Sequence, residues 1–155
     1  MDQFTGLEHR VEYVGEREGI RFYNDSKATT VASVVRALEC FQDPVLLLAG
    51  GKDKGSPFAP LREPLRRHVR RLFLYGEAAE RMARELEGAT EMERARDLEA
   101  AVEQAWWAAR PGEVVLLSPA CSSFDMFKDY EERGRRFKDL VKEIRPGVSP
   151  TQGEG

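Results

Sequence analysis

Short apolar runs alternate with amphipathic stretches along most of this 155-residue chain. Continuously apolar runs, typical of strands buried on both faces of a parallel sheet, occupy residues 45–49, 72–75 and 114–117. Apolar residues recur at helical spacing over residues 31–41, 59–67, 77–86, 98–109 and 126–144. Strands that alternate with helices predict an α/β fold: a doubly wound, mostly parallel, Rossmann-like sheet with helices on both faces.

The two ends of the chain differ from this pattern. Alternating runs at residues 11–14 and 20–23 flank a loop at 15–19 and predict an N-terminal antiparallel hairpin. A further short strand is expected at residues 90–93. The last residues are rich in Gly, Pro, Ser and Thr. We therefore expect one domain over residues 1–146, which is enough chain for a proper core, and a flexible tail over 147–155.

Composition narrows the class of protein. The net charge is −3, with 24 basic and 27 acidic residues interspersed, so the chain has no basic footprint for nucleic acid or an anionic membrane. No run is long enough to span a bilayer, no signal peptide opens the chain, and two cysteines suit a reducing compartment, so we expect a cytoplasmic protein. His9 and His68 are the only histidines, which argues against a zinc site.

Three polar loops follow predicted strands. They read Asn-Asp-Ser-Lys-Ala-Thr-Thr at 24–30, Gly-Gly-Lys-Asp-Lys-Gly at 50–55 and Ser-Pro-Ala-Cys-Ser-Ser at 118–123. Ligands of parallel α/β sheets bind at the carboxyl ends of the strands, so three such loops predict one shared site. Taken alone, the first loop is also a series of acceptable N-caps for the helix that follows. Cys121 is expected to be a small buried residue rather than a nucleophile, because no histidine is near it in sequence.

The loops lack the spacing of a Walker P-loop or a Gly-x-Gly-x-x-Gly turn, so we expect no cradle for a triphosphate or dinucleotide. The loops offer two cations, Lys27 and Lys54, and two hydroxyls, Thr29 and Ser123. They also offer two helix N-termini, near Val31 and Asp125. This set suits a small dicarboxylate or a single phosphate. The alternative is that the lysines are solvated residues of mobile loops.

Five segments, in this order, resemble one family. They are Phe-Thr-Gly-Leu-Glu-His-Arg at 4–10, Asn-Asp-Ser-Lys-Ala-Thr at 24–29, Gly-Gly-Lys-Asp-Lys-Gly at 50–55, Leu-Ser-Pro-Ala-Cys-Ser-Ser-Phe-Asp at 117–125 and Phe-Lys-Asp-Tyr-Glu-Glu-Arg-Gly at 127–134. Together they resemble the C-terminal domain of the Mur ligases that add D-glutamate (the MurD type). The resemblance covers nearly the whole chain, which begins near the family's domain junction. We therefore expect an excised domain of a longer enzyme.

The resemblance implies an ATP-dependent ligase that joins D-glutamate to UDP-MurNAc-L-alanine in peptidoglycan synthesis. In that family ATP phosphorylates the L-alanine carboxylate, the D-glutamate amine attacks the acyl phosphate, and phosphate leaves. An N-terminal domain holds the UDP group, and a central domain carries the P-loop and the Mg²⁺ ligands. The domain alone is accordingly expected to be inactive and to bind neither ATP nor Mg²⁺ tightly.

The resemblance also implies roles on the nucleotide side. Arg10 and Asp25 would touch the ribose or the phosphates of ATP. Lys27 would approach the γ-phosphate and the acyl phosphate, where its charge counters the charge that develops during transfer. His9 lies in the motif as either a structural histidine or a direct contact, and Thr30 stands where many relatives have Asn.

On the amino-acid side, the resemblance implies that Thr29, Lys54 and Ser123 hold the carboxylates of D-glutamate. Tyr130 stands where relatives often have Phe and would contribute through its backbone. Two alternatives stay open: the domain of a different Mur or folylpolyglutamate-type ligase, or a stand-alone module for small acidic metabolites. The Asn-Asp-Ser-Lys-Ala-Thr run argues against the first, and a P-loop domain encoded directly upstream would remove the second.

Overall fold

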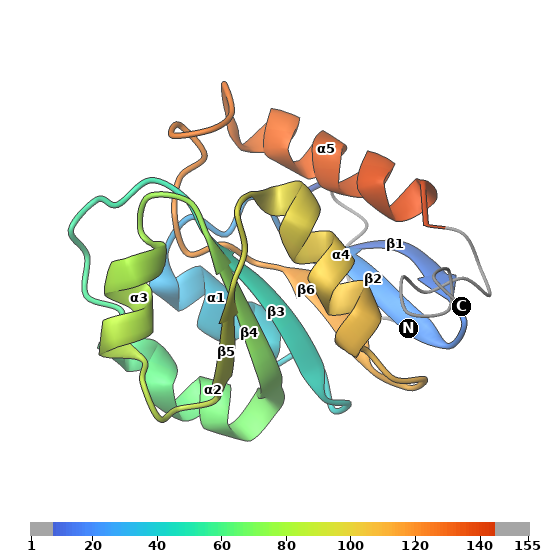
Figure 1. The fold of residues 1–155 in the computed structure, drawn as a ribbon, viewed down its shortest axis with the longest axis horizontal. Helices are drawn as coiled ribbons and strands as arrows, with labels where there is room; N and C mark the ends of the chain where they lie inside the picture. The colour runs from blue at the N-terminus through green and yellow to red at the C-terminus, as the bar shows by residue number, and fades with distance from the viewer. Residues whose placement is uncertain (1–7, 145–155) are drawn as a thin grey trace.

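A six-stranded mixed sheet runs through the molecule in the order β1-β2-β6-β3-β4-β5 (Figure 1). The computed structural model describes residues 8–144. The strands are β1 Glu12–Arg17, β2 Ile20–Asn24, β3 Val45–Gly50, β4 Val69–Tyr75, β5 Glu91–Arg94 and β6 Val114–Leu117. The helices are α1 Val31–Leu38, the 3₁₀ helix η1 Ala59–Leu61, α2 Arg62–His68, α3 Ala79–Glu85, α4 Leu98–Ala108 and α5 Tyr130–Lys142.

Only the β1–β2 pair is antiparallel among the strand pairs of the described residues; the other four pairs are parallel. The predicted α/β class and N-terminal hairpin are thus confirmed. The turn differs from the expected loop at 15–19, because the strands continue to Arg17 and Ile20 and only Glu18 and Gly19 separate them. Both of these residues have positive φ, 54° and 83°, the geometry of the tight turn that suits twisted strands.

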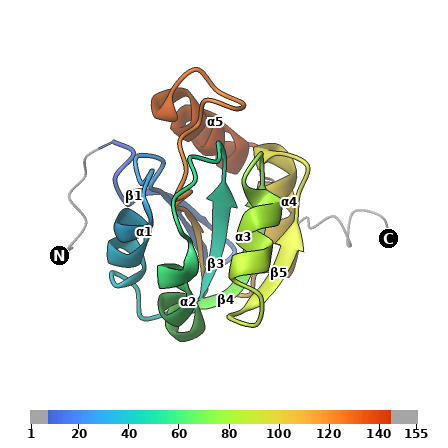
Figure 2. The ribbon, with the colours of Figure 1, turned by 90° about the vertical axis from the view of Figure 1, so that its left-hand side faces the viewer.

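Two layers of helices sandwich the sheet. α1, α2 and α3 pack on one face, and α4 and α5 on the other, as Figures 1 and 2 show. The position of β3 between the two helical layers explains why its sequence is continuously apolar. Leu47 and Ala49 join the core under α1–α3, while Leu46 and Leu48 join the core under α4 and α5. Both faces of this strand are therefore buried, as in other parallel sheets that helices cover on two sides.

Several predicted boundaries were wrong, and each has a local reason. The last helix begins at Tyr130 rather than near Met126, because Asp129 is extended and its side chain caps the amide of Glu132. Residues 124–126 instead form a separate turn. In it, the carbonyl of Ser123 accepts the amides of Met126 and Phe127 at 3.1 and 2.8 Å. The helix N-terminus expected near Asp125 is therefore absent from this part of the described chain.

Two further boundaries moved by about three residues. Strand β4 starts at Val69, not at residue 72, because the arginines after Val69 extend the pairing with β3 and bind acidic partners. Helix α1 ends at Leu38 rather than at residue 41, with Glu39 as its C-cap. Within residues 8–144, every helix is too short or too polar to cross a membrane.

Candidate functional site

The three polar loops meet at one edge of the sheet, as predicted. They leave β2, β6 and β3, which are neighbours and parallel, so their carboxyl ends lie side by side. Backbone hydrogen bonds tie each loop to the next. These bonds run from Asp25 N to Leu117 O (2.7 Å), from Ala120 N to Ala28 O (2.9 Å), from Gly50 N to Pro119 O (3.0 Å) and from Lys52 N to Ser122 O (3.0 Å). The positions of the loops are thus fixed by main-chain atoms.

The two glycines of the second loop allow this close approach. Gly50 and Gly51 have φ of 135° and 137°. A Cβ atom on Gly50 would lie 1.9 Å from Tyr75 O, and one on Gly51 would lie 2.4 Å from Ser122 O. A side chain on Gly50 would push this loop away from the end of β4, and one on Gly51 would push it away from the loop after β6. The Gly-Gly pair therefore serves close packing of the loop, which explains its composition without the spacing of a phosphate loop.

Asp25 is a buried carboxylate at the end of β2. Its Oδ1 accepts the amide of Val11 at 3.0 Å, and its Oδ2 accepts the hydroxyl of Ser118 at 2.8 Å. Burial raises its pKa to about 6, although both hydrogen bonds and the charge of the nearby, exposed Arg10 favour the ionised form. The structure therefore places the two predicted nucleotide-side residues near each other. Asp25 already uses both of its oxygens within the protein.

Lys27 and Tyr130 lie against each other. The ammonium Nζ of Lys27 is 3.3 Å from the Tyr130 hydroxyl and 5.1 Å from the centroid of the ring. This contact gives the Tyr130 hydroxyl a function that phenylalanine lacks. The backbone of Tyr130 is also engaged, since its carbonyl accepts the hydroxyl of Ser26 at 2.7 Å. Lys27 remains exposed, so its charge is available to a ligand.

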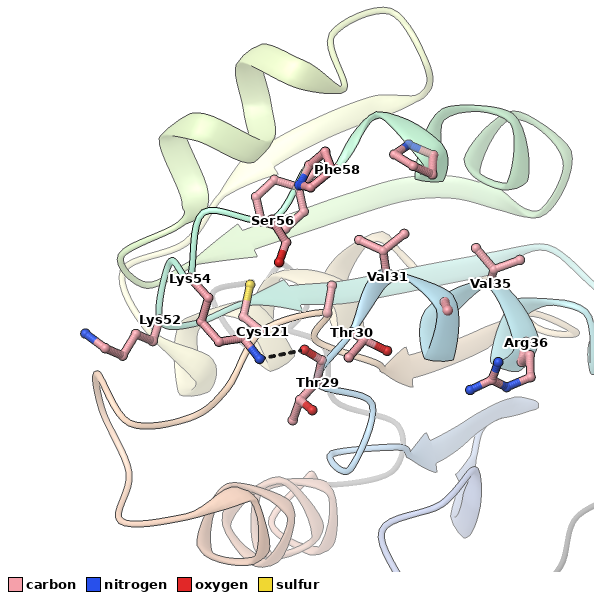
Figure 3. A pocket seen from close by; sticks show the side chains of 14 residues that line it. Thr29, Thr30, Val31, Val35, Arg36, Lys52, Lys54, Ser56, Phe58 and Cys121 are labelled. Atoms are coloured by element: carbon pink, nitrogen blue, oxygen red, sulfur yellow. Dashed lines mark hydrogen bonds between the residues drawn. The ribbon is translucent and has the colours of Figure 1, made fainter.

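Thr29 and Lys54 form a second pair. Lys54 Nζ donates to the carbonyl of Thr29 at 3.3 Å (Figure 3). Ser123, the third predicted carboxylate ligand, is only 1% exposed, and its Oγ has no hydrogen-bond partner. The structure thus brings Thr29 and Lys54 together at the surface and Lys27 next to Tyr130. The Ser123 hydroxyl is buried in the loop after β6.

A groove of ≈ 570 Å³ opens beside Lys54, between α1 and the chain that leads into η1 (Figure 3). Its walls are largely apolar, with Val31 and Val35 from α1 opposite Phe58. Three cations and no carboxylate line it: Arg36, Lys52 and Lys54. Cys121 also faces it but is buried, and burial raises the pKa of its thiol to about 12, so it is a thiol and not a nucleophile at neutral pH.

His9 and Thr30 have structural positions. His9 is buried, and its Nδ1 accepts from the side-chain amide of Asn24 at 2.8 Å. Burial lowers its pKa, so the ring is neutral at pH 7. The carbonyl of His9 accepts the amide of Lys27 at 3.0 Å and so helps to place that lysine. Thr30 is the N-cap of α1, where its Oγ1 accepts the amide of Ser33 at 3.2 Å.

Sequence reasoning missed Arg133, which lies in α5 directly beneath the loops. It is fully buried and donates to Ser26 twice, from Nε to Oγ and from Nη2 to the carbonyl, each at 2.9 Å. A signal was present in the spacing. The inward stripe of α5 contains Phe137, Leu140 and Val141, and four residues before Phe137 the same stripe reaches Arg133.

Residues 9–121 match a family model described as "Mur ligase, glutamate ligase domain". The chain is 53% identical over 150 residues to the UDP-N-acetylmuramoylalanine--D-glutamate ligase of Geobacter metallireducens, covering 97% of this chain and 33% of that protein. It is 54% identical over 144 residues to the protein of the same name from Trichlorobacter lovleyi, covering 93% and 32%. The chain thus spans about a third of the length of these curated relatives.

Solved structures share the fold at low sequence identity. A bifunctional folylpolyglutamate synthase/dihydrofolate synthase from Yersinia pestis superposes with a TM-score of 0.64 at 17% identity, covering 90% of this chain and 32% of that one. A murein peptide ligase from Psychrobacter arcticus gives a TM-score of 0.62 at 12% identity, covering 92% and 32%. These likenesses confirm the α/β architecture and carry no information on substrate.

Proposed function

Because this chain belongs to the Mur ligase family, as its glutamate ligase domain, we propose that it is the C-terminal, amino-acid-binding part of an ATP-dependent ligase. The ligase would add D-glutamate to UDP-MurNAc-L-alanine in the cytoplasm, during peptidoglycan synthesis. One observation supports this substrate above all. Relatives that are 50–54% identical over at least 92% of the chain carry the name UDP-N-acetylmuramoylalanine--D-glutamate ligase.

The charges at the loop edge suit an acidic amino acid. Lys54 is exposed, and its only described partner is a backbone carbonyl, so a carboxylate can replace that weak contact with a charge-assisted one. Thr29 and the groove lie beside it, and the groove has no acidic side chain to repel a dicarboxylate. We assign Lys54, Thr29 and the buried hydroxyl of Ser123 to the carboxylates of D-glutamate.

Lys27 would act on the phosphate side of the reaction. Its Nζ is oriented by the Tyr130 hydroxyl and stays exposed. A fixed cation next to a transferring phosphoryl group stabilises charge that develops in the transition state. Arg10, exposed and close enough to influence the carboxylate of Asp25, would meet the nucleotide on the same side.

ATP and Mg²⁺ would be shared with other domains of the longer enzyme. Residues 8–144 contain no group of three His, Cys, Asp or Glu side chains that could hold a metal ion. We propose that the Mg²⁺ ligands and the triphosphate cradle lie in the other domains, because the loops of this chain lack the spacing of a P-loop. The ion supplies charge neutralisation at the phosphates, while Lys27 and Arg10 supply cations from this side.

The test is the activity of the longer protein that contains this chain. It should release phosphate from ATP only when UDP-MurNAc-L-alanine and D-glutamate are both present, and L-glutamate, L-lysine or diaminopimelate should not replace D-glutamate. Phosphate release that depends on one of those other amino acids, or on a folate substrate, would assign the chain to a different ligase of the same fold. The 155-residue chain alone should show neither ligase nor ATPase activity.

A further inference from the structure

Arg133 has the largest side chain that the structure buries completely. It lies in the first turn of α5, which crosses the sheet edge where the loops after β2 and β6 emerge (Figure 1). Its Nε and Nη2 both bind Ser26, whose hydroxyl in turn binds the carbonyl of Tyr130 at 2.7 Å. The guanidinium fork therefore fastens the loop that carries Lys27 to the helix that carries Tyr130.

This guanidinium is charged at neutral pH but has no carboxylate within ion-pair distance among residues 8–144. Tyr75 and Cys121 lie near enough to act on the guanidinium, and so does Asp125, whose carboxylate accepts the amide of Glu77 at 3.1 Å. The contrast with Arg70 is informative. Arg70 is also largely buried, but its Nε and Nη2 lie 2.6 and 3.0 Å from the carboxylate of Glu113.

A buried charge without a partner is unfavourable for folding, because the guanidinium loses its hydration and gains no opposite charge. Nη1 of Arg133 makes no hydrogen bond, although the buried Tyr75 hydroxyl, which also has no hydrogen-bond partner, is close enough to act on the guanidinium. Nη1 lies under Gly51, where a Cβ atom would be 3.3 Å from it. The buried hydroxyls of Ser122 and Ser123, in the adjacent loop, are unpartnered as well. Positive charge and unused donors are thus gathered beneath the loops.

We propose that Arg133 is the positioning residue of an anion site formed by the loops after β2, β3 and β6. Its fork holds Ser26 and, through it, Tyr130, while its uncompensated charge attracts a carboxylate or a similar small anion to the loops. That the anion is the carboxylate of D-glutamate rests on the proposed function. It follows that a bound anion stabilises the fold, because it supplies the charge that Arg133 lacks.

The test compares three variants of the 155-residue chain by thermal unfolding, with D-glutamate or sulfate added at constant ionic strength balanced by chloride. For the wild type, ten times the dissociation constant of either anion should raise the Tm by about 3–5 °C. Arg133→Met removes the charge but leaves the carbonyl of Ser26 without its donor. Since these effects oppose each other, its Tm without added anion should stay within about 3 °C of wild type, and its response to both anions should be lost.

Arg70→Met is the matched control at the opposite edge of the sheet. It leaves the carboxylate of Glu113 buried and unpaired, so its Tm should fall well below that of Arg133→Met, whereas its response to anions should equal that of wild type. An Arg133→Met chain whose Tm still rises with the anion as in wild type would overturn the inference, whatever its starting Tm.

A chain with Arg133→Met that does not fold leaves Arg133→Lys to decide. Lysine keeps the charge but cannot form the fork, so the half-saturating anion concentration should rise at least about threefold, and an unchanged concentration overturns the inference. The two proposals can fail separately. A response to sulfate but not to D-glutamate, lost in Arg133→Met, supports the anion site and contradicts the D-glutamate assignment. A response to D-glutamate that persists in Arg133→Met supports the D-glutamate assignment and contradicts the role of Arg133 in the anion site.

Discussion

Lys27 and Tyr130, 103 residues apart in the chain, share both a hydrogen bond of 3.3 Å and a cation–π contact of 5.1 Å. The first residue follows β2 and the second opens α5, so the contact forms only when the helix docks over the loop. The orientation of Lys27 therefore depends on tertiary structure.

Tyr130→Phe should weaken the reaction only slightly in the longer ligase. The change removes the hydroxyl that orients Lys27 but keeps the ring and the backbone carbonyl that Ser26 binds. Loss of one exposed hydrogen bond corresponds to roughly a two- to fivefold decrease in kcat. Steady-state kinetics with saturating substrates measure it. A decrease of a hundredfold or more would mean that the hydroxyl contacts the reacting groups directly.

Lys27→Ala should lower kcat of the longer ligase by at least about a hundredfold, the scale of one lost preorganised charge contact. The effect should lie in kcat, because the cation acts mainly on charge that develops in the transition state. Lys128→Ala, which removes an exposed lysine elsewhere in the same region, is the control and should be near wild type. A rise in the KM for D-glutamate with normal kcat would move Lys27 to the amino-acid side.

Lys54→Ala should raise the KM for D-glutamate by roughly ten- to a hundredfold, since a charge-assisted contact contributes about 1.5–3 kcal/mol. Ser123→Ala should do less, and neither change should alter the KM for ATP. Stability should hardly change in Lys54→Ala, because the exposed Nζ makes one long contact, with Thr29. Lys142→Ala, which removes an exposed lysine at the end of α5, is the control. An ATP-selective defect in Lys54→Ala would contradict the assignment.

The raised pKa of Asp25 predicts a pH-dependent contribution to the free energy of unfolding. Its pKa in the fold, about 6, lies above the ordinary value of 3.8, so the folded state binds the proton more tightly. This stabilising contribution is fully present below pH 3.8 and is lost as the pH rises through about 6. Between pH 7.5 and 5.5 it should add about 1 kcal/mol to the free energy of unfolding.

The measurement is urea unfolding of wild type and Asp25→Asn at both pH values. Asparagine keeps an acceptor for Val11 and can donate to Ser118, so the variant should fold and lack this contribution. His9 works in the opposite direction, because burial lowers its pKa, but it does so in both proteins. Equal pH dependence of the two proteins would show that Asp25 titrates normally.

Gly134→Ala should destabilise the fold although alanine favours helices. A Cβ atom there would lie 2.1 Å from Nδ1 of His9, a buried ring that also packs edge-on against Tyr130. The overpacking should cost about 1–3 kcal/mol beyond the gain of up to about 1 kcal/mol in helix propensity. Chemical denaturation measures the difference. His9→Ala should cost less stability in the Gly134→Ala background than in wild type, and equal costs in the two backgrounds would exclude this clash as the cause.

Sequence alone was sufficient for the sheet and for the meeting of its loops. The apolar run that contains Leu46, Leu47 and Leu48 is typical of a strand buried on both faces, and parallel strands bring their carboxyl ends to one edge. The start of α5 was missed because Met126 and Phe127 continue the apolar pattern, whereas Asp129 decides the boundary through a side-chain cap. The hairpin turn was missed because nothing in the identity of Glu18 indicates a positive φ.

The site was harder to predict than the fold. Lysines in loops read equally well as solvated residues, and only the docking of α5 shows that Lys27 has a partner. Ser123 was expected beside a helix start, but it is buried and its carbonyl closes a turn instead. Arg133 was overlooked because arginine is rarely buried without a carboxylate. Each of these outcomes depends on contacts between segments far apart in the chain.

The main-chain hydrogen bonds that join the three loops have a consequence for how such a domain can change over evolutionary time. Gly50, Lys52, Ala120 and Asp25 are held to their neighbours through amides and carbonyls, which every residue except proline provides. Exposed side chains on this frame, such as those of Lys27 and Lys54, can be exchanged without moving it, whereas Gly50 and Gly51 have no room for a side chain. New selectivity for an amino acid then requires a few substitutions on the loops and no redesign of the sheet.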